Sequence, residues 1–275
     1  MMTRLLTSAA LCACVSLLTI GATLPTHADE ENILAQREAR WKDIEKTIFG
    51  DKVATPDESV VKLDAPTRAE DASLVPITIT LDPKQPIKAL YFVIDDNPSP
   101  VAAHYTFGPA ADPHVIKMRV RVNGYTNMHA VAELQDGRLV EAVKFIKAAG
   151  GCSAPMGMSD EEAMKGMGEM RMKFAQDVTP GKSTEATLMV RHPNFNGMQM
   201  NQVTRNYTPA RYIQTIEVND GNRLVFTLGT GISLSANPVI SFRMVPQRSG
   251  DVTVAVSDNK KGHWEKSFAL PMAMN

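Results

Sequence analysis

The chain has 275 residues, enough for one large domain or for two smaller domains of about 100–150 residues each. Its formal net charge is −1, charged residues make up 21% of it, and no long basic run occurs. This charge pattern excludes nucleic acid and an anionic membrane surface as expected partners.

The first 28 residues have the pattern of a secretory signal peptide. Arg4 supplies the positive charge, residues 5–24 are apolar, and Ala28 is a small residue at the expected cleavage site. Cleavage there would place a soluble mature protein, without a membrane span, in the periplasm. Two alternatives stay open. The run 5–24 is long enough for an uncleaved anchor, and Leu-Cys-Ala-Cys at 11–14 is a loose lipoprotein signal.

The next segment predicts one helix followed by a β-rich region. Apolar residues recur at three- and four-residue spacing over 31–49, and Gly50 ends the pattern. Residues 51–68 look irregular, and then the apolar period changes to two. Turn signals such as Asp136-Gly137 separate short alternating runs at the intervals of a β-sandwich. The expected strands are 74–81, 87–94, 103–107, 115–122, 128–134 and 139–148.

Residues 150–182 interrupt the β pattern with a methionine-rich segment. Ser159 and Glu162 form a capping box, which predicts a helix over about 160–176. The three-residue spacing of Met164, Met167 and Met170 favours a helix face that packs on a sandwich. The six methionines of the segment are Met156, Met158, Met164, Met167, Met170 and Met172.

A second β series follows, so the sequence predicts an all-β protein of two immunoglobulin-like β-sandwiches in tandem, with an N-terminal helix and a Met-rich helical linker. The expected parts are a signal peptide at 1–28, a sandwich with its helix at 29–149, a linker at 150–182 and a sandwich at 183–275. The strands of the second series are 184–191, 212–218, 224–230, 239–245, 251–257 and 264–270.

Cys152 is the one cysteine that remains after removal of the signal peptide. Gly150 and Gly151 precede it and Ser153 follows it, which predicts an exposed, flexible tether rather than a helix or a strand. A lone thiol in an oxidising compartment has no internal disulfide partner, so this pattern favours a reactive group. Two alternatives stay open, a small buried side chain and an intermolecular disulfide.

The chemistry expected at this thiol depends on its neighbours. Lys144 and Lys147, or the N-terminus of the predicted helix, could lower the thiol pKa and so increase the thiolate fraction. Met156 and Met158 offer soft thioether ligands that, together with Cys152, could hold Cu(I). Packing is the simpler interpretation of these methionines, so no metal or other cofactor is predicted.

The remaining polar residues show no enzyme active site. The histidines are scattered without metal-ligand spacing, and His192 is interpreted as structural. Asp95 and Asp96 precede Asn97-Pro98, which is ordinary turn chemistry. No phosphate-binding loop, Ser-His-Asp order or CxxC motif occurs. We therefore predict that the protein is not an enzyme.

Several runs of the sequence resemble a pair of known families. The first half resembles SoxY, the cysteine-bearing subunit of the SoxYZ sulfur carrier, and the second half resembles SoxZ. The SoxY-like runs are 68–77, 95–100, 116–122, 136–137 and Gly150-Gly151-Cys152, and the SoxZ-like runs are 188–193, 235–238 and 257–259, with Gly197, Tyr212, Ile213 and Gly262. The order of these runs is most similar to the fused SoxYZ-like carriers associated with quinoprotein dehydrogenases.

The resemblance implies a carrier rather than a catalyst. It makes Cys152 the covalent attachment point for a sulfur-containing or other thiol-linked intermediate, with Gly150 and Gly151 as the approach. It also implies that the two halves pair within the chain and that periplasmic partners, a c-type cytochrome or a quinoprotein dehydrogenase system, load or process the adduct. Ser153-Ala154-Pro155 replaces the trailing glycines of the SoxY arm, so this thiol lies on a loop held at both ends. A non-covalent accessory module for such a dehydrogenase and a Cu(I)-binding protein are the alternatives.

Overall fold

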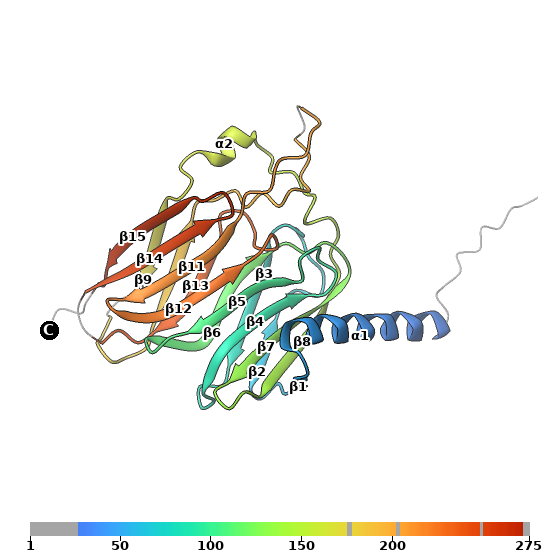
Figure 1. Ribbon diagram of the computed structural model, residues 1–275, viewed down its shortest axis with the longest axis horizontal. Helices are drawn as coiled ribbons and strands as arrows, with labels where there is room; N and C mark the ends of the chain where they lie inside the picture. The colour runs from blue at the N-terminus through green and yellow to red at the C-terminus, as the bar shows by residue number, and fades with distance from the viewer. Residues whose placement is uncertain (1–26, 175–177, 202–203, 248–249, 272–275) are drawn as a thin grey trace, which may run out of the picture. The chain divides into compact units, whose positions relative to one another are not determined.

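The computed structural model describes residues 27–174, 178–201, 204–247 and 250–271 (Figure 1). It divides into two compact units, 1–36 and 37–275, and the unit that begins at Arg37 contains both predicted sandwiches. The predicted signal peptide lies outside the described residues, except for its last two positions. Within the described ranges, no helix is long and apolar enough to cross a membrane.

The N-terminal helix α1 covers His27–Phe49 and so begins four residues before the predicted start. In its second half, Trp41 is buried, and Ile44 and Ile48 are half-buried against a small apolar cluster with Val93 and Val131. These helix residues recur at three- and four-residue spacing, so they share the face that contacts the sheet. The predicted helix is therefore confirmed, and its packed face lies on the first half of the β-structure.

Two β-sheets form the body of the second unit, and each of them runs through both halves of the chain. The nine-stranded sheet has the order β1-β8-β7-β4-β5-β12-β11-β14-β15, and the six-stranded sheet has the order β2-β3-β6-β13-β10-β9. The strands of the first half are β1 Ala54–Pro56, β2 Val61–Asp64, β3 Val75–Leu81, β4 Ile87–Ile94, β5 Val101–Phe107, β6 Ala111–Val120, β7 Thr126–Leu134 and β8 Leu139–Ile146. Those of the second half are β9 Met170–Phe174, β10 Thr184–Val190, β11 Ile213–Asp220, β12 Arg223–Thr230, β13 Val239–Met244, β14 Asp251–Asp258 and β15 His263–Ala269.

The halves join through backbone pairing in both layers. In the nine-stranded sheet, β5 pairs antiparallel with β12, so that Tyr105 lies opposite Leu228. In the six-stranded sheet, β6 pairs antiparallel with β13, so that Lys117 lies opposite Ser241. Figure 1 shows the β5–β12 and β6–β13 junctions between the two groups of strands. We call this double junction the seam.

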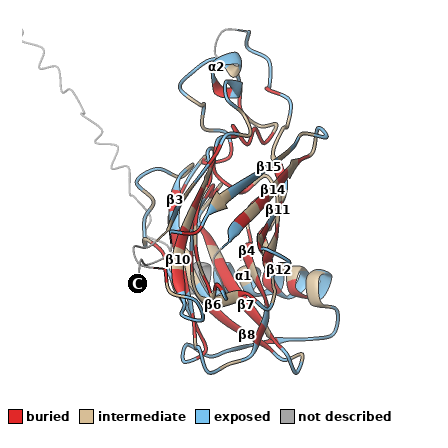
Figure 2. Cartoon of the chain, turned by 90° about the vertical axis from the view of Figure 1, so that its left-hand side faces the viewer, coloured by how far each residue is buried: buried red, intermediate tan, exposed pale blue. Residues whose placement is uncertain are grey.

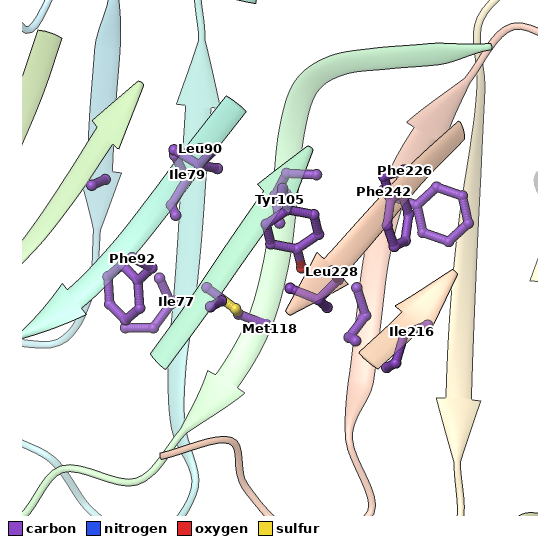
Figure 3. Close-up of a cluster of buried hydrophobic side chains, with 14 of the residues drawn as sticks. Ile77, Ile79, Leu90, Phe92, Tyr105, Met118, Ile216, Phe226, Leu228 and Phe242 are labelled. Carbon is purple, nitrogen blue, oxygen red and sulfur yellow. The ribbon is translucent and has the colours of Figure 1, made fainter. Parts of the chain in front are cut away.

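One core fills the space between the layers and continues across the seam. Along β3 the side chains alternate between buried and more exposed positions, as expected for a strand with one face on a core. Figure 2 shows buried residues on strands of both sheets. In Figure 3, Tyr105 and Met118 lie between first-half side chains such as Phe92 and second-half side chains such as Leu228 and Phe226. The core therefore has no boundary at the seam.

Both halves have the predicted all-β architecture, and the predicted strands agree with the observed ones to within a few residues. Three strands were not predicted. Two of them, β1 and β2, lie in the segment expected to be irregular, and β9 lies in the expected helix. β1 has only 3 residues and β2 only 4, which is too short for a clear alternating pattern.

The predicted linker helix over 160–176 is largely wrong. Ser159 does cap a helix, because its side chain accepts a hydrogen bond from the Glu162 backbone N–H, but α2 covers only Asp160–Met164. Gly166 and Gly168 then adopt positive φ angles of 64° and 89°, which a continuing helix does not allow.

The predicted methionine stripe is absent because its members belong to different elements. Met164 is exposed at the end of α2, Met167 lies in the turn after it, and Met170 is buried on β9. β9 pairs antiparallel with β10, so Met172 lies opposite Leu188. The second sheet-forming half therefore begins at Met170 rather than at residue 183.

Candidate functional site

Cys152 lies in a turn that contacts both halves of the chain, and it is fully buried, with a relative exposure of 0%. The sequence-based expectation of an exposed thiol is therefore wrong for this conformation. Gly151 explains the burial, since a Cβ atom there would come within 2.0 Å of the Ala72 carbonyl oxygen and 2.6 Å of the Val122 carbonyl oxygen. Gly151 thus allows close packing of the backbone, Gly150 allows a positive φ, and the two glycines do not produce a free arm.

The expected flexible tether is an ordered turn. Gly150 has a φ of 70° and donates its backbone N–H to the Asn123 carbonyl at 2.9 Å. Gly151 donates to the Val122 carbonyl at 3.1 Å, and Ser153 donates to the Gly150 carbonyl at 3.1 Å. Ser153 alone of the three expected tether residues is exposed. The first half of the chain thus holds the backbone on both sides of the thiol.

The second half of the chain holds the same turn from the other side. Asn196 donates its side-chain amide to the Cys152 carbonyl oxygen at 2.6 Å, and Gln199 donates to the Ala154 carbonyl at 3.4 Å. Both amides are buried. They belong to the loop that follows β10, which lies at the same end of the molecule as α2 in Figures 1 and 2. The cysteine is therefore closed in by residues of both halves.

Arg121 is a buried charge at this site that the sequence analysis did not single out. It directly follows β6, where the alternation along the strand would continue the exposed positions of Lys117 and Arg119. Its side chain is nevertheless only 2% exposed. The guanidinium contacts the Gly151 carbonyl and the Asn194 carbonyl, each at 3.5 Å. The signal in the sequence was an arginine two positions before a turn, which is too common to indicate a site.

The electrostatics of the thiol depend on two opposing effects. Burial raises the pKa of Cys152, and the charge on Arg121 lowers it, with a net rise. Burial in turn lowers the pKa of Arg121, and the charges of Cys152 and Asp71 oppose this change. The predicted roles of Lys144 and Lys147 are not confirmed, because Arg121 is the charged group that acts on the thiol. In this buried position the sulfur is therefore a protonated thiol at neutral pH.

A pocket of about 790 Å³ begins three residues beyond the cysteine. It lies between the segment 155–161 and the second-half loop residues 195–201 and 204–209. Its lining combines apolar side chains such as Met156, Met158 and Phe195 with polar ones such as Gln199, Asn206 and Thr208, and it includes two carboxylates, Asp160 and Glu161. The segment that carries the cysteine therefore forms one wall of a cavity.

The three residues proposed for Cu(I) lie in different surroundings. Met158 is 46% exposed, and Cys152 is buried. The Met156 sulfur lies 4.0 Å from a guanidinium nitrogen of Arg121. A cation against this thioether disfavours a second cation at the same atom. Among the described residues, no group of three or more His, Cys, Asp or Glu side chains is placed to hold a metal ion.

The two other sequence motifs have structural surroundings. His192 is fully buried, and its Nδ1 accepts the Asn194 backbone N–H at 3.1 Å, while burial lowers its pKa. The turn at 95–98, predicted to be an ordinary turn, also contributes a side chain that connects the two halves of the chain. Asn97 is buried and donates to the Arg121 carbonyl and to the Ser233 hydroxyl, each at 2.8 Å, so it joins the two halves beside the site.

Comparisons with known proteins agree with this arrangement. Residues 45–152 match the family described as sulfur oxidation protein SoxY, and residues 171–269 match the family described as sulphur oxidation protein SoxZ. The SoxY match ends at Cys152. A comparison with curated proteins gives no match.

Solved structures give weaker likenesses. The sulfur carrier protein SoxY from Chlorobium limicola f thiosulfatophilum is 22% identical with a TM-score of 0.38, covering 43% of this chain and 99% of that one. A superoxide reductase (neelaredoxin) from Ignicoccus hospitalis is 19% identical with a TM-score of 0.28, covering 32% of this chain and 78% of that one. Both TM-scores are too low to support a conclusion about function.

Proposed function

Since the chain carries a SoxY domain and a SoxZ domain in tandem and so belongs to the SoxYZ sulfur carriers, we propose that it holds its cargo covalently on Cys152. The observation that supports this most strongly is the position of the thiol. It is the last residue of the SoxY match, and residues of both halves enclose it. A site that needs both domains fits a carrier in which the second domain helps to protect the cargo.

Loading requires the cysteine turn to open, because the sulfur is buried. The side-chain bonds that hold the second-half loop on this turn are few, namely those from Asn196 and Gln199, and the backbone bonds of Gly150 and Gly151 to the first half can stay in place. Each hydrogen bond contributes a net of about 0.5–1.5 kcal/mol, so the binding energy of a partner can offset their loss. We propose that docking of a loading enzyme displaces the loop that carries Asn196 and Gln199.

The covalent step needs a redox partner. Joining the Cys152 thiolate to the thiolate end of a sulfur species forms one S–S bond and releases two electrons. We propose that a c-type cytochrome or a quinoprotein dehydrogenase system in the periplasm accepts these electrons, so that the carrier itself is not the catalyst. The signal-peptide pattern of residues 1–28 supports that compartment. Mature protein that begins at Asp29 in a periplasmic fraction would agree with it, and a cytoplasmic full-length chain would contradict it.

The intact mass of the protein isolated from its native cells tests the proposal. We expect an added mass on Cys152 during growth that uses the pathway, and we expect a Cys152→Ser variant to carry no such mass and to abolish the phenotype. The burial of the thiol favours one rival, a non-covalent accessory module in which the sulfur takes no part. An unmodified thiol together with a fully functional Cys152→Ser variant would select that rival.

A further inference from the structure

Arg121 is a buried cation with no carboxylate at ion-pair distance among the described residues, and the Asp71 carboxylate acts on its charge only from farther away. The Nε of Arg121 has no hydrogen-bond partner within the described ranges. Its other nitrogens make only long contacts, at 3.5 Å to two carbonyl oxygens and at 4.0 Å to the Met156 sulfur. An unpaired buried charge is costly, so this arrangement needs a reason.

The turn that carries the thiol surrounds the guanidinium. Gly151, whose carbonyl it contacts, directly precedes Cys152, and Met156 follows Cys152 by four positions. Asn194, the third contact, lies two residues before the Asn196 that bonds to the Cys152 carbonyl. The donors of Arg121 therefore lie among the same segments that enclose the sulfur.

We infer that Arg121 is a positioning residue that makes the closed Cys152 site selective for adducts that end in an anionic group, such as a sulfonate, a carboxylate or a terminal thiolate. This inference rests on the proposed carrier function. A guanidinium offers a planar set of donors that matches two oxygens of such a group. An anionic end would give Nε a partner and would replace the long contacts by short, charge-assisted ones. A cationic end would place two buried positive charges together.

A pair of thiol reagents that differ in charge tests this selectivity. The full chain with Cys12→Ser and Cys14→Ser is labelled in denaturant and then refolded. One reagent, a methanethiosulfonate with an ethylsulfonate arm, adds an anion, and the other, with an ethyltrimethylammonium arm, adds a cation. In each case the Cys152 thiolate forms a disulfide with the sulfenyl sulfur of the reagent, methanesulfinate leaves with the electron pair, and the thiol proton goes to the buffer.

The unfolding equilibrium of each adduct is then measured with urea. We expect the anionic adduct to have an unfolding constant about 10- to 100-fold smaller than the cationic adduct, the range of a hydrogen-bonded charge. Arg121→Met should remove this difference. Arg119→Met, on the exposed face of β6, should leave it unchanged. Arg121→Lys, which keeps the charge and loses the planar fork, should keep a reduced difference.

Equal stabilities of the two wild-type adducts would overturn the inference, and so would a difference that persists in Arg121→Met. If Arg121→Met does not fold, equal wild-type stabilities still overturn the inference, and a difference that is reduced in Arg121→Lys but unchanged in Arg119→Met assigns the preference to Arg121. Because the reagents load the thiol artificially, the result does not depend on whether the native protein carries an adduct. A native protein without added mass would contradict the carrier proposal, whereas a lack of charge preference would contradict only the role of Arg121.

Discussion

Asn196, from the second half of the chain, donates its side-chain amide to the carbonyl oxygen of Cys152 at 2.6 Å. Both residues are buried, so this bond joins the two halves in a site that solvent does not reach. It is the shortest of the side-chain bonds that hold the cysteine turn. The opening of the turn, and hence the reactivity of the thiol, should depend on it.

Replacing Asn196 by alanine should therefore increase the rate at which iodoacetamide labels the folded protein. The loss of a bond worth about 0.5–1.5 kcal/mol predicts a reaction at Cys152 that is about 3- to 10-fold faster. The matched control is Asn219→Ala, because the Asn219 amide bonds to Glu217 and not to the cysteine turn. Labelling is followed by mass spectrometry in native buffer. Equal rates for the three proteins would show that the bond does not control access.

The thiolate of the folded protein should form only at high pH. Burial raises the pKa of Cys152 and Arg121 partly opposes this effect, so Arg121→Met should raise the pKa further. A cysteine pKa that is higher in the folded state stabilises the fold below the unfolded value of about 8.5, and this stabilisation is lost as the pH rises beyond it. Ultraviolet absorbance of the thiolate, recorded as a function of pH, measures the pKa of Cys152 in the wild type and in Arg121→Met. A lower pKa in Arg121→Met would contradict the assigned electrostatics.

Gly151→Ala should destabilise the turn and expose the thiol. The added Cβ would meet two backbone carbonyl oxygens, those of Ala72 and Val122, well inside contact distance. We expect a loss of about 1–3 kcal/mol in the free energy of unfolding, the typical cost of overpacking, with faster thiol labelling. Gly124→Ala is the control, because a Cβ there meets nothing within 4 Å. Urea denaturation compares the two variants, and equal losses would refute the close-packing role of Gly151.

His129 should contribute stability that depends on pH. It is buried between Glu141, 2.8 Å from Nδ1, and Asp95, 3.3 Å from Nε2, and it stacks on Trp41 of α1. Burial lowers the pKa of His129, but hydrogen bonds to the two carboxylates outweigh it and raise the pKa. Its contribution is therefore complete below the unfolded pKa of about 6.5 and is lost as the pH rises through the higher folded pKa.

His129→Gln should accordingly lose about 3 kcal/mol of unfolding free energy at a pH of about 5.5, because one partner of a buried charged group is removed, and less at a pH of about 8.5. Urea denaturation at the two pH values measures the loss. His104→Gln is the control. Because burial lowers the pKa of His104, the effect of this substitution on the free energy of unfolding should change with pH in the opposite direction. A loss at His129 that does not change with pH would show that the imidazolium makes no contribution.

Tyr105→Phe should leave the protein as stable as before or stabilise it by about 1 kcal/mol. The Tyr105 ring is fully buried at the seam, and its hydroxyl has no hydrogen-bond partner among the described residues. Removing an unsatisfied buried hydroxyl recovers its desolvation cost. Thermal unfolding of this variant is compared with that of Tyr91→Phe, at a half-buried ring, which should change little. A large loss in Tyr105→Phe alone would mean that the hydroxyl is bonded.

The sequence predicted the strands well because alternation of apolar residues reports directly on a face buried against a core. The prediction failed where a short local pattern suggested a helix and the contacts of the folded chain instead formed a strand. The capping box at Ser159 does begin a helix, but Gly166 and Gly168 end it after 5 residues. The alternation of Met170 and Met172 with Arg171 and Lys173 was a strand signal hidden among methionines.

The sequence singled out Cys152, whose role as the attachment point stays a prediction, and it predicted the wrong surroundings for this residue. A lone cysteine after two glycines drew attention to residue 152, but the glycines were interpreted as a flexible tether, whereas Gly151 provides close packing and Gly150 a positive φ. Arg121 and Asn196 could not be found from the sequence, because they come 31 residues before and 44 residues after the cysteine and meet it only once the sheets are assembled. A pattern of neighbouring residues in the sequence cannot indicate contacts between residues so far apart in the chain.

The β5–β12 and β6–β13 ladders have a consequence for how this carrier behaves on dilution. Because both partners of each ladder belong to one polypeptide, their effective concentration is set by the connecting chain and not by the amount of protein in the compartment. The hydrogen bond from Asn196 to the Cys152 carbonyl oxygen therefore stays formed at any dilution. The stoichiometry of the two domains is also fixed at one to one, so no excess of either half can compete for a partner.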